Sequence, residues 1–184
     1  DVYKRPLRKR LVLFLLSTGA GLVIMLEYLV QNGFGFINDA YSIIMTIVLV
    51  LFSGIFSVVV YSWPVTDVVA NIGNESGKIG LVVKRMKVAK GFLFAVIYTG
   101  VAMTLLRMLF NSVLEPGVSE FVSIIFTFII SLWAGAMITR CIVSVFDETV
   151  SKKIIILLAA SAWYYIIMFQ IIGFIIKSAY SIIL

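Results

Sequence analysis

Four polar side chains within otherwise apolar stretches are the residues of this sequence best placed to do chemistry inside a membrane. Glu27 and Arg107 each lie near the end of an apolar stretch. Gln170 and Lys177 lie seven residues apart in another, a spacing that puts them on one helical face. Ionisable groups at such positions are costly and are therefore candidate functional sites. We expect one intramembrane polar cluster in which Glu27 pairs with Arg107.

Two interpretations of this cluster stay open. A buried ion pair that holds helices together is the more common role of such residues, with Lys177 extending its ammonium group to the interface. A proton or ion pathway would need several aligned carboxylates or histidines, and the sequence contains no histidine. A structural ion pair is the first expectation, and a role in moving or sensing an ion is the second.

A basic run before the third apolar stretch supplies a second set of candidates. Its members are Lys84, Arg85, Lys87 and Lys90. Near a membrane surface, each cation contributes roughly 1 kcal/mol of attraction to anionic lipid headgroups. The same residues could instead serve only to orient the chain in the membrane.

Other kinds of chemistry have few residues to work with. The single cysteine, Cys141, can form neither an intrachain disulfide nor a multi-cysteine metal site. Phosphate-binding loops, nucleophile elbows and zinc-protease motifs are absent from the sequence. The net charge is +6, but the cations flank apolar stretches, which is typical of membrane topology and not of a nucleic-acid groove. We therefore expect no enzymatic activity, cofactor, metal or nucleic-acid partner.

The elements that must position these residues follow from composition. The chain of 184 residues is 62% hydrophobic and 13% charged, whereas soluble domains are about 45–50% apolar and about 25% charged. The surplus apolar surface must face lipid, and the sequence lacks the two-residue alternation of a membrane barrel. We predict an all-α polytopic integral membrane protein, a single domain over 1–184. Its five transmembrane helices cover 11–30, 41–63, 92–110, 121–145 and 154–176.

The charges of the connections predict the orientation. Cations precede the first, third and fifth stretches, whereas the other two connections carry acidic residues and no cation. Because cationic connections stay on the cytoplasmic side, we expect the N-terminus inside and the C-terminus outside. The segment from Lys78 to Lys90 has periodic apolar residues and no helix breaker, so it should continue into the third helix. Pro64, directly after Trp63, predicts the end of the second helix.

Small and aromatic residues predict how the helices meet. Four-residue spacing of small residues favours close helix contacts, and it occurs at Ser17 and Gly21, at Ser53 and Ser57, and at Ser131, Gly135 and Thr139. Trp163, Tyr164 and Tyr165 fall near the middle of the fifth stretch. A tyrosine hydroxyl at that depth needs a partner, so we expect Tyr164 or Tyr165 to face protein.

Two segments resemble a known family. Residues 1–6, DVYKRP, resemble the Asp-Leu-Tyr-Gly-Pro motif of Yip1-type five-span membrane domains, although the glycine is missing and the proline is displaced by one position. The segment from Leu132 to Phe146, followed by a polar turn and Lys152 and Lys153, resembles the fourth and fifth spans of such domains. The layout of spans and termini is also similar. The resemblance implies a non-enzymatic membrane-organising or trafficking-type protein that works through partners.

These observations favour a scaffold, trafficking-type or accessory subunit of a membrane assembly, located in the cell membrane or an endomembrane. Its expected partners are membrane lipids, including anionic headgroups, and other membrane protein subunits. The alternative is a small transporter or permease subunit, which needs a polar cavity near the midplane and commonly broken helices. No predicted span carries both proline and glycine interruptions at mid-depth. An enzyme acting on lipid ranks third.

Overall fold

The computed structural model describes residues 4–33, 40–72, 78–146 and 150–183, and every element within these ranges is helical. The elements are α1 (Lys4–Asn32), α2 (Ala40–Ile72), α3 (Lys78–Val113), α4 (Pro116–Phe146), α5 (Val150–Tyr165), the π-helical turn η1 (Ile166–Ile172) and α6 (Gly173–Ile183). Five helical segments are long and apolar enough to cross a membrane, with α5, η1 and α6 together forming the fifth. The predicted all-α class and the number of spanning helices are confirmed. Residues 1–3, part of the family-like motif, lie outside the described ranges.

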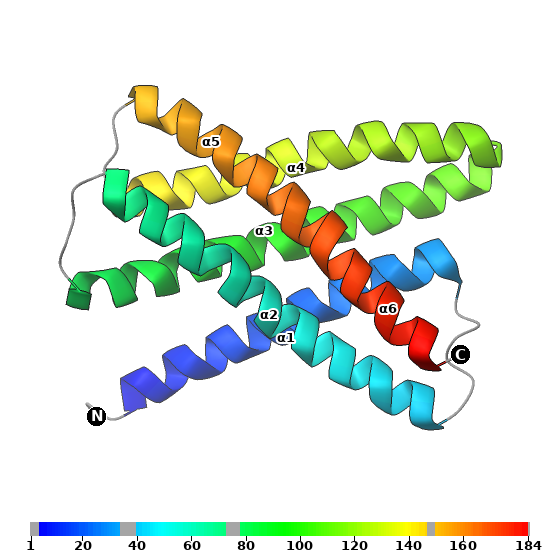
Figure 1. The fold of residues 1–184 in the computed structure, drawn as a ribbon, viewed down its shortest axis with the longest axis horizontal. Helices are drawn as coiled ribbons and strands as arrows, with labels where there is room; N and C mark the ends of the chain where they lie inside the picture. Colours follow the sequence, from blue (N-terminus) through cyan, green and yellow to red (C-terminus); the bar gives the residue numbers. More distant parts are fainter. Residues whose placement is uncertain (1–3, 34–39, 73–77, 147–149, 184) are drawn as a thin grey trace.

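Successive helices run in opposite directions along the long axis of the bundle, so the two ends of the chain lie at opposite ends of that axis (Figure 1). We call the end where α1, α3 and α5 begin the N-terminal end, and the other the C-terminal end. The continuous α5–η1–α6 segment crosses the bundle diagonally (Figure 1). α3 packs against α1, α2 and α4, and 50% of its apolar span is buried, compared with 28% to 33% of the others. α3 is therefore the central helix.

Glycines allow α1 and α2 to approach each other closely. A Cβ added to Gly21 would lie 1.9 Å from the carbonyl oxygen of Val50, and one added to Gly54 would lie 2.0 Å from that of Ser17. The two backbones are thus in direct contact, as small-residue spacing predicts. The contact at Ser17 and Gly21 was predicted, whereas its partner Gly54 was missed because the predicted pair on α2 was the flanking serines.

α4 and α5 meet in the same way. A Cβ added to Gly135 would lie 1.9 Å from the Ser161 hydroxyl, so this predicted small residue also marks a close helix contact.

The predicted end of the second helix at Pro64 is wrong, because α2 continues through the proline to Ile72. A proline lacks the N–H that would bond the carbonyl four residues earlier, here that of Val60. The indole N–H of Trp163 on α5 donates to this Val60 oxygen at 3.3 Å. Nearby, the Tyr61 hydroxyl donates to the carbonyl oxygen of Ala160 at 3.0 Å. The Trp163 indole of α5 therefore satisfies the carbonyl that the proline leaves open.

The N-terminal part of α3 is helical from Lys78 and continuous with the rest of the helix, as predicted. It is braced against α2 by an ion pair between Arg85 and Asp67. The Arg85 guanidinium also lies 5.6 Å from the Trp63 ring centroid, within the range of a cation–π contact.

A buried aromatic cluster, formed by Tyr61, Phe92 and Tyr164, joins α2, α3 and α5. The rings of Tyr61 and Phe92 stack with centroids 4.2 Å apart, and the Tyr164 ring packs edge-on against both. All three side chains are at most 2% exposed. The Tyr164 hydroxyl lies 2.7 Å from Thr99 Oγ1, so the prediction that Tyr164 or Tyr165 faces protein is confirmed by Tyr164.

Candidate functional site

An ion pair between α1 and α3 lies at the centre of the candidate site. Nη2 of Arg107 lies 3.5 Å from Oε1 of Glu27, and the two side chains are 9% and 14% exposed. The sequence predicted that Glu27 pairs with Arg107, and the structure confirms this pair. The distance exceeds the roughly 2.7–2.9 Å of a charge-assisted hydrogen bond. The buried Nε of Arg107 has no partner among the described residues. The guanidinium thus keeps donor capacity that Glu27 does not use.

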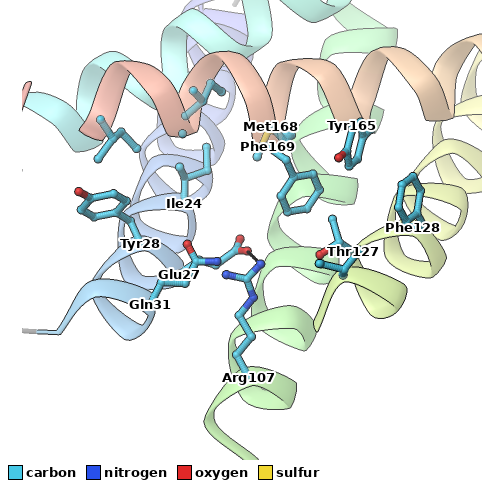
Figure 2. A pocket seen from close by; sticks show the side chains of 14 residues that line it. Ile24, Glu27, Tyr28, Gln31, Arg107, Thr127, Phe128, Tyr165, Met168 and Phe169 are labelled. Carbon is cyan, nitrogen blue, oxygen red and sulfur yellow. Dashed lines mark ion pairs between the residues drawn. The ribbon is translucent and has the colours of Figure 1, made fainter. Parts of the chain in front are cut away.

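A cavity of about 250 Å³ surrounds the pair; we call it the polar cavity. Its walls come from α1, α3, α4, η1 and α6. Figure 2 shows the Arg107 side chain rising from α3 toward Glu27 and Gln31 of α1, with Thr127 of α4 on one side and Phe169 of η1 above. The lining of the cavity therefore includes one cation, one anion, one amide, three hydroxyl groups and four aromatic rings, together with aliphatic side chains.

A second hollow of about 630 Å³ adjoins the polar cavity and shares Gln31, Arg107, Ile124 and Thr127 with it. We call it the vestibule. Its other walls include Asn111, Ser119, Ser123 and Glu120, residues on both sides of the turn between α3 and α4. The vestibule thus connects the ion pair to the C-terminal end of the bundle through polar side chains.

Toward the N-terminal end, the interior closes. Between Glu27 and Tyr164 lies a void of about 10 Å³, at the lower limit for holding one water. Beyond it lies the aromatic cluster of Tyr61, Phe92 and Tyr164. The cavity is therefore accessible from one end of the bundle and closed toward the other.

The π-helical turn η1 forms one wall of the polar cavity through Met168, Phe169 and Ile172. π turns have i→i+5 hydrogen bonds and occur frequently at functional sites. The turn was missed because the sequence from Ile166 to Ile172 contains neither proline nor glycine. Next to it, the Tyr165 ring stacks on Phe128 of α4 with centroids 5.2 Å apart.

Gln170 and Lys177 do not join the ion pair, so the predicted four-residue cluster is wrong in this respect. Both side chains are exposed, and neither lines the polar cavity. Gln170 donates instead to the Tyr165 hydroxyl at 3.3 Å. The face of this helix that turns inward is apolar, formed by residues such as Ile172 and Ile176.

The basic run lies near the N-terminal end, away from the cavity (Figure 1). Lys87 is exposed, whereas Lys84, Arg85 and Lys90 are partly buried. The Lys84 ammonium lies 4.5 Å from the Phe146 ring centroid. Lys84, Arg85 and Lys90 are therefore held partly against the bundle, whereas Lys87 extends away from it.

Within the part of the chain that the structure describes, no three acidic, cysteine or histidine residues are grouped so as to hold a metal ion. Comparisons with protein-family models, curated proteins and solved structures found no match. The functional argument therefore rests on the bundle and its cavity.

Proposed function

We propose that this chain is a non-enzymatic integral membrane protein that acts as a scaffold, trafficking-type or accessory subunit of a membrane assembly. The observation that carries the proposal is the closed N-terminal half. Among the described residues, the buried aromatic cluster and the small void of about 10 Å³ separate the polar cavity from the N-terminal end of the bundle. A bundle closed in this way suits a partner-binding role better than conduction. It is built around α3 and closely packed at Gly21 and Gly54.

We further propose that the N-terminal end faces the cytoplasm and the C-terminal end faces outward. Cations lie in the N-terminal parts of α3 and α5 at the first of these ends, namely the basic run, Lys152 and Lys153. At the other end, the α3–α4 turn carries Glu115 and Glu120. Single cysteines in a Cys141→Ala background provide the test. An impermeant thiol reagent applied to intact cells should label positions 33–38 and 112–118 and spare 72–90. The reverse pattern would contradict the orientation.

Contact between the basic run and anionic headgroups is part of the proposal. Lys87 is exposed, which leaves its ammonium group available to a phosphate oxygen. Each cation near the surface should contribute about 1 kcal/mol of attraction. Replacing Lys84, Lys87 and Lys90 with glutamine should reduce anionic lipid co-purifying with the protein, whereas Lys177→Gln should not.

The subunit proposal predicts protein neighbours on a defined face. A photo-crosslinking residue placed at exposed apolar positions, such as Ile129 and Leu132 on α4 or Ile47 on α2, would sample different faces. We expect one face to yield the same protein adduct repeatedly, and the others to yield lipid adducts. A monomer in mild detergent that gives lipid adducts on every face would contradict the proposal.

Transport is the second candidate, favoured by one observation. A π-helical interruption of the fifth span lies beside a cavity that contains two charged residues, an arrangement comparable to the broken helices of transporters. Solute flux into proteoliposomes above that of empty vesicles would establish this candidate in place of the first.

A further inference from the structure

We propose that the polar cavity is a binding site for a small zwitterion, whose oxyanion contacts Arg107 and whose cationic group faces Glu27. This inference concerns ligand binding only, and it holds whether the chain is an assembly subunit or a transporter. The close contacts between helices lie at Gly21, Gly54 and Gly135, away from the cavity. Packing of the bundle therefore does not by itself explain why the cavity is there.

The first step of the argument is the unused donor. Arg107 is nine-tenths buried, makes a single 3.5 Å contact with Glu27, and has an Nε without a partner among the described residues. A guanidinium presents its donors as a planar fork that matches two oxygens of a carboxylate or phosphate. Arg107 lines the polar cavity and holds Glu27 only loosely, so an oxyanion there would meet a buried cation whose guanidinium is not fully engaged.

The second step is the sign of the charges. A simple anion bound to Arg107 would be repelled by the nearby Glu27 carboxylate. A simple cation bound to Glu27 would be repelled by Arg107. Burying a net charge in such a site is costly, whereas a ligand with both signs brings a partner for each wall charge. Phe169 and Tyr165 also line the cavity, and the faces of their rings are suited to a cationic group. The cavity thus matches a zwitterion better than an ion of one sign.

The third step is access and size. The polar cavity, of about 250 Å³, can hold several non-hydrogen atoms, and the vestibule connects it with the C-terminal end of the bundle. Gln31 and Thr127 line both spaces and can exchange hydrogen bonds with an entering ligand. The same chemistry is present in a free amino acid and in the headgroup of a zwitterionic phospholipid, so the experiment must distinguish these two sources.

The variants are chosen to separate binding from folding. Gly173 lines the cavity, and a Cβ added there would meet no heavy atom within 4 Å, so the Cβ of Gly173→Leu has room and the rest of the side chain should narrow the space beside the cavity. Arg107→Lys keeps the charge but removes the planar fork. Lys177→Gln is the matched control, because Lys177 is exposed and does not line the cavity. Unchanged melting temperatures without ligand would show that the variants fold.

Binding is measured by calorimetry on the purified protein, with glycine and glycerophosphoethanolamine as soluble probes and with inorganic phosphate and ethylamine as probes of one sign. In parallel, native mass spectrometry follows retention of phosphatidylethanolamine from nanodiscs that otherwise contain phosphatidylglycerol. We expect Arg107→Lys and Gly173→Leu each to weaken binding about tenfold or more, comparable to the loss of a hydrogen bond to a charged group. Lys177→Gln should change binding by less than about twofold.

Binding of a soluble zwitterion would support a free ligand, and selective retention of phosphatidylethanolamine alone would support a lipid headgroup. The proposal is overturned if neither the two soluble zwitterions nor phosphatidylethanolamine binds, or if phosphate or ethylamine binds as well as the soluble zwitterions do. Binding that is unaffected in a folded Gly173→Leu protein would also overturn it, because the ligand would then lie elsewhere.

Discussion

Neutralising one residue of the Glu27–Arg107 pair should destabilise the protein about as much as neutralising both. If the two residues acted independently, the double variant would instead lose the sum of the two single losses. Removing one partner of a buried pair typically costs about 3–5 kcal/mol, because the other charge stays buried. Here the contact is single and 3.5 Å long, and it adjoins a cavity. We therefore expect about 2–3 kcal/mol for Glu27→Gln and for Arg107→Gln, below the typical range because the contact is loose.

The double variant should cost about as much as one single variant, since two neutral amides leave no charge unpaired. This corresponds to a coupling free energy of roughly 2 kcal/mol, within the range for residues in direct contact. For a chain of this length, 1 kcal/mol shifts the melting temperature by about 2–4 °C. Each single variant should therefore melt about 4–12 °C below the original protein. Intrinsic fluorescence of the three tryptophans follows the unfolding of the purified protein in detergent.

Lys177→Gln is the control for a change of one unit of charge, and it should alter stability by less than about 0.5 kcal/mol because the side chain is exposed. The decisive quantity is the deviation from additivity. If the losses of stability in the two single variants simply add in the double variant, the residues are not coupled, and the 3.5 Å contact carries no stabilising interaction.

Two further substitutions test the packing of the helices by thermal unfolding. Gly54→Ala should destabilise the protein by about 1–3 kcal/mol or more, because the new Cβ meets a backbone carbonyl, whereas Gly117→Ala has open space and should be tolerated. Equal effects of the two would exclude the close contact. Trp163→Phe should cost about 1–3 kcal/mol by leaving the Val60 carbonyl unsatisfied, and should cost less in a Pro64→Ala background that restores a backbone donor. An identical cost in both backgrounds would show that the indole does not serve this carbonyl.

The sequence was sufficient for features that depend on hydropathy and on distance along a helix. Five apolar stretches predicted the spanning helices because lipid-facing surface must be apolar over about 20 residues. Counting 1.5 Å per residue along the helices places Glu27 and Arg107 at a similar depth. Because α1 and α3 are neighbours in the bundle, that similar depth lets the two side chains pair. The burial of Tyr164 followed from the cost of an unsatisfied hydroxyl.

Features that depend on distant partners could not be predicted. The helix continues through Pro64 because Trp163, about 100 residues later, supplies a hydrogen bond to Val60. Likewise, the seven-residue spacing of Gln170 and Lys177 predicts that they share a face but not which way that face turns. The answer depends on the packing of the whole α5–η1–α6 segment, whose π turn has no marker in the sequence.

The position of the cavity follows from where polar atoms find partners within the bundle. In the N-terminal half, Tyr61 and Tyr164 direct their hydroxyls to the Ala160 carbonyl and to Thr99, and the interior packs closed around them. At the level of Arg107, the donors exceed the acceptors that the described helices provide. Apolar side chains packed against that guanidinium would leave a buried donor unsatisfied, at a cost of about 1–3 kcal/mol or more. The hollow beside Arg107, with η1 as one of its walls, leaves room for water or a polar ligand to contact the guanidinium.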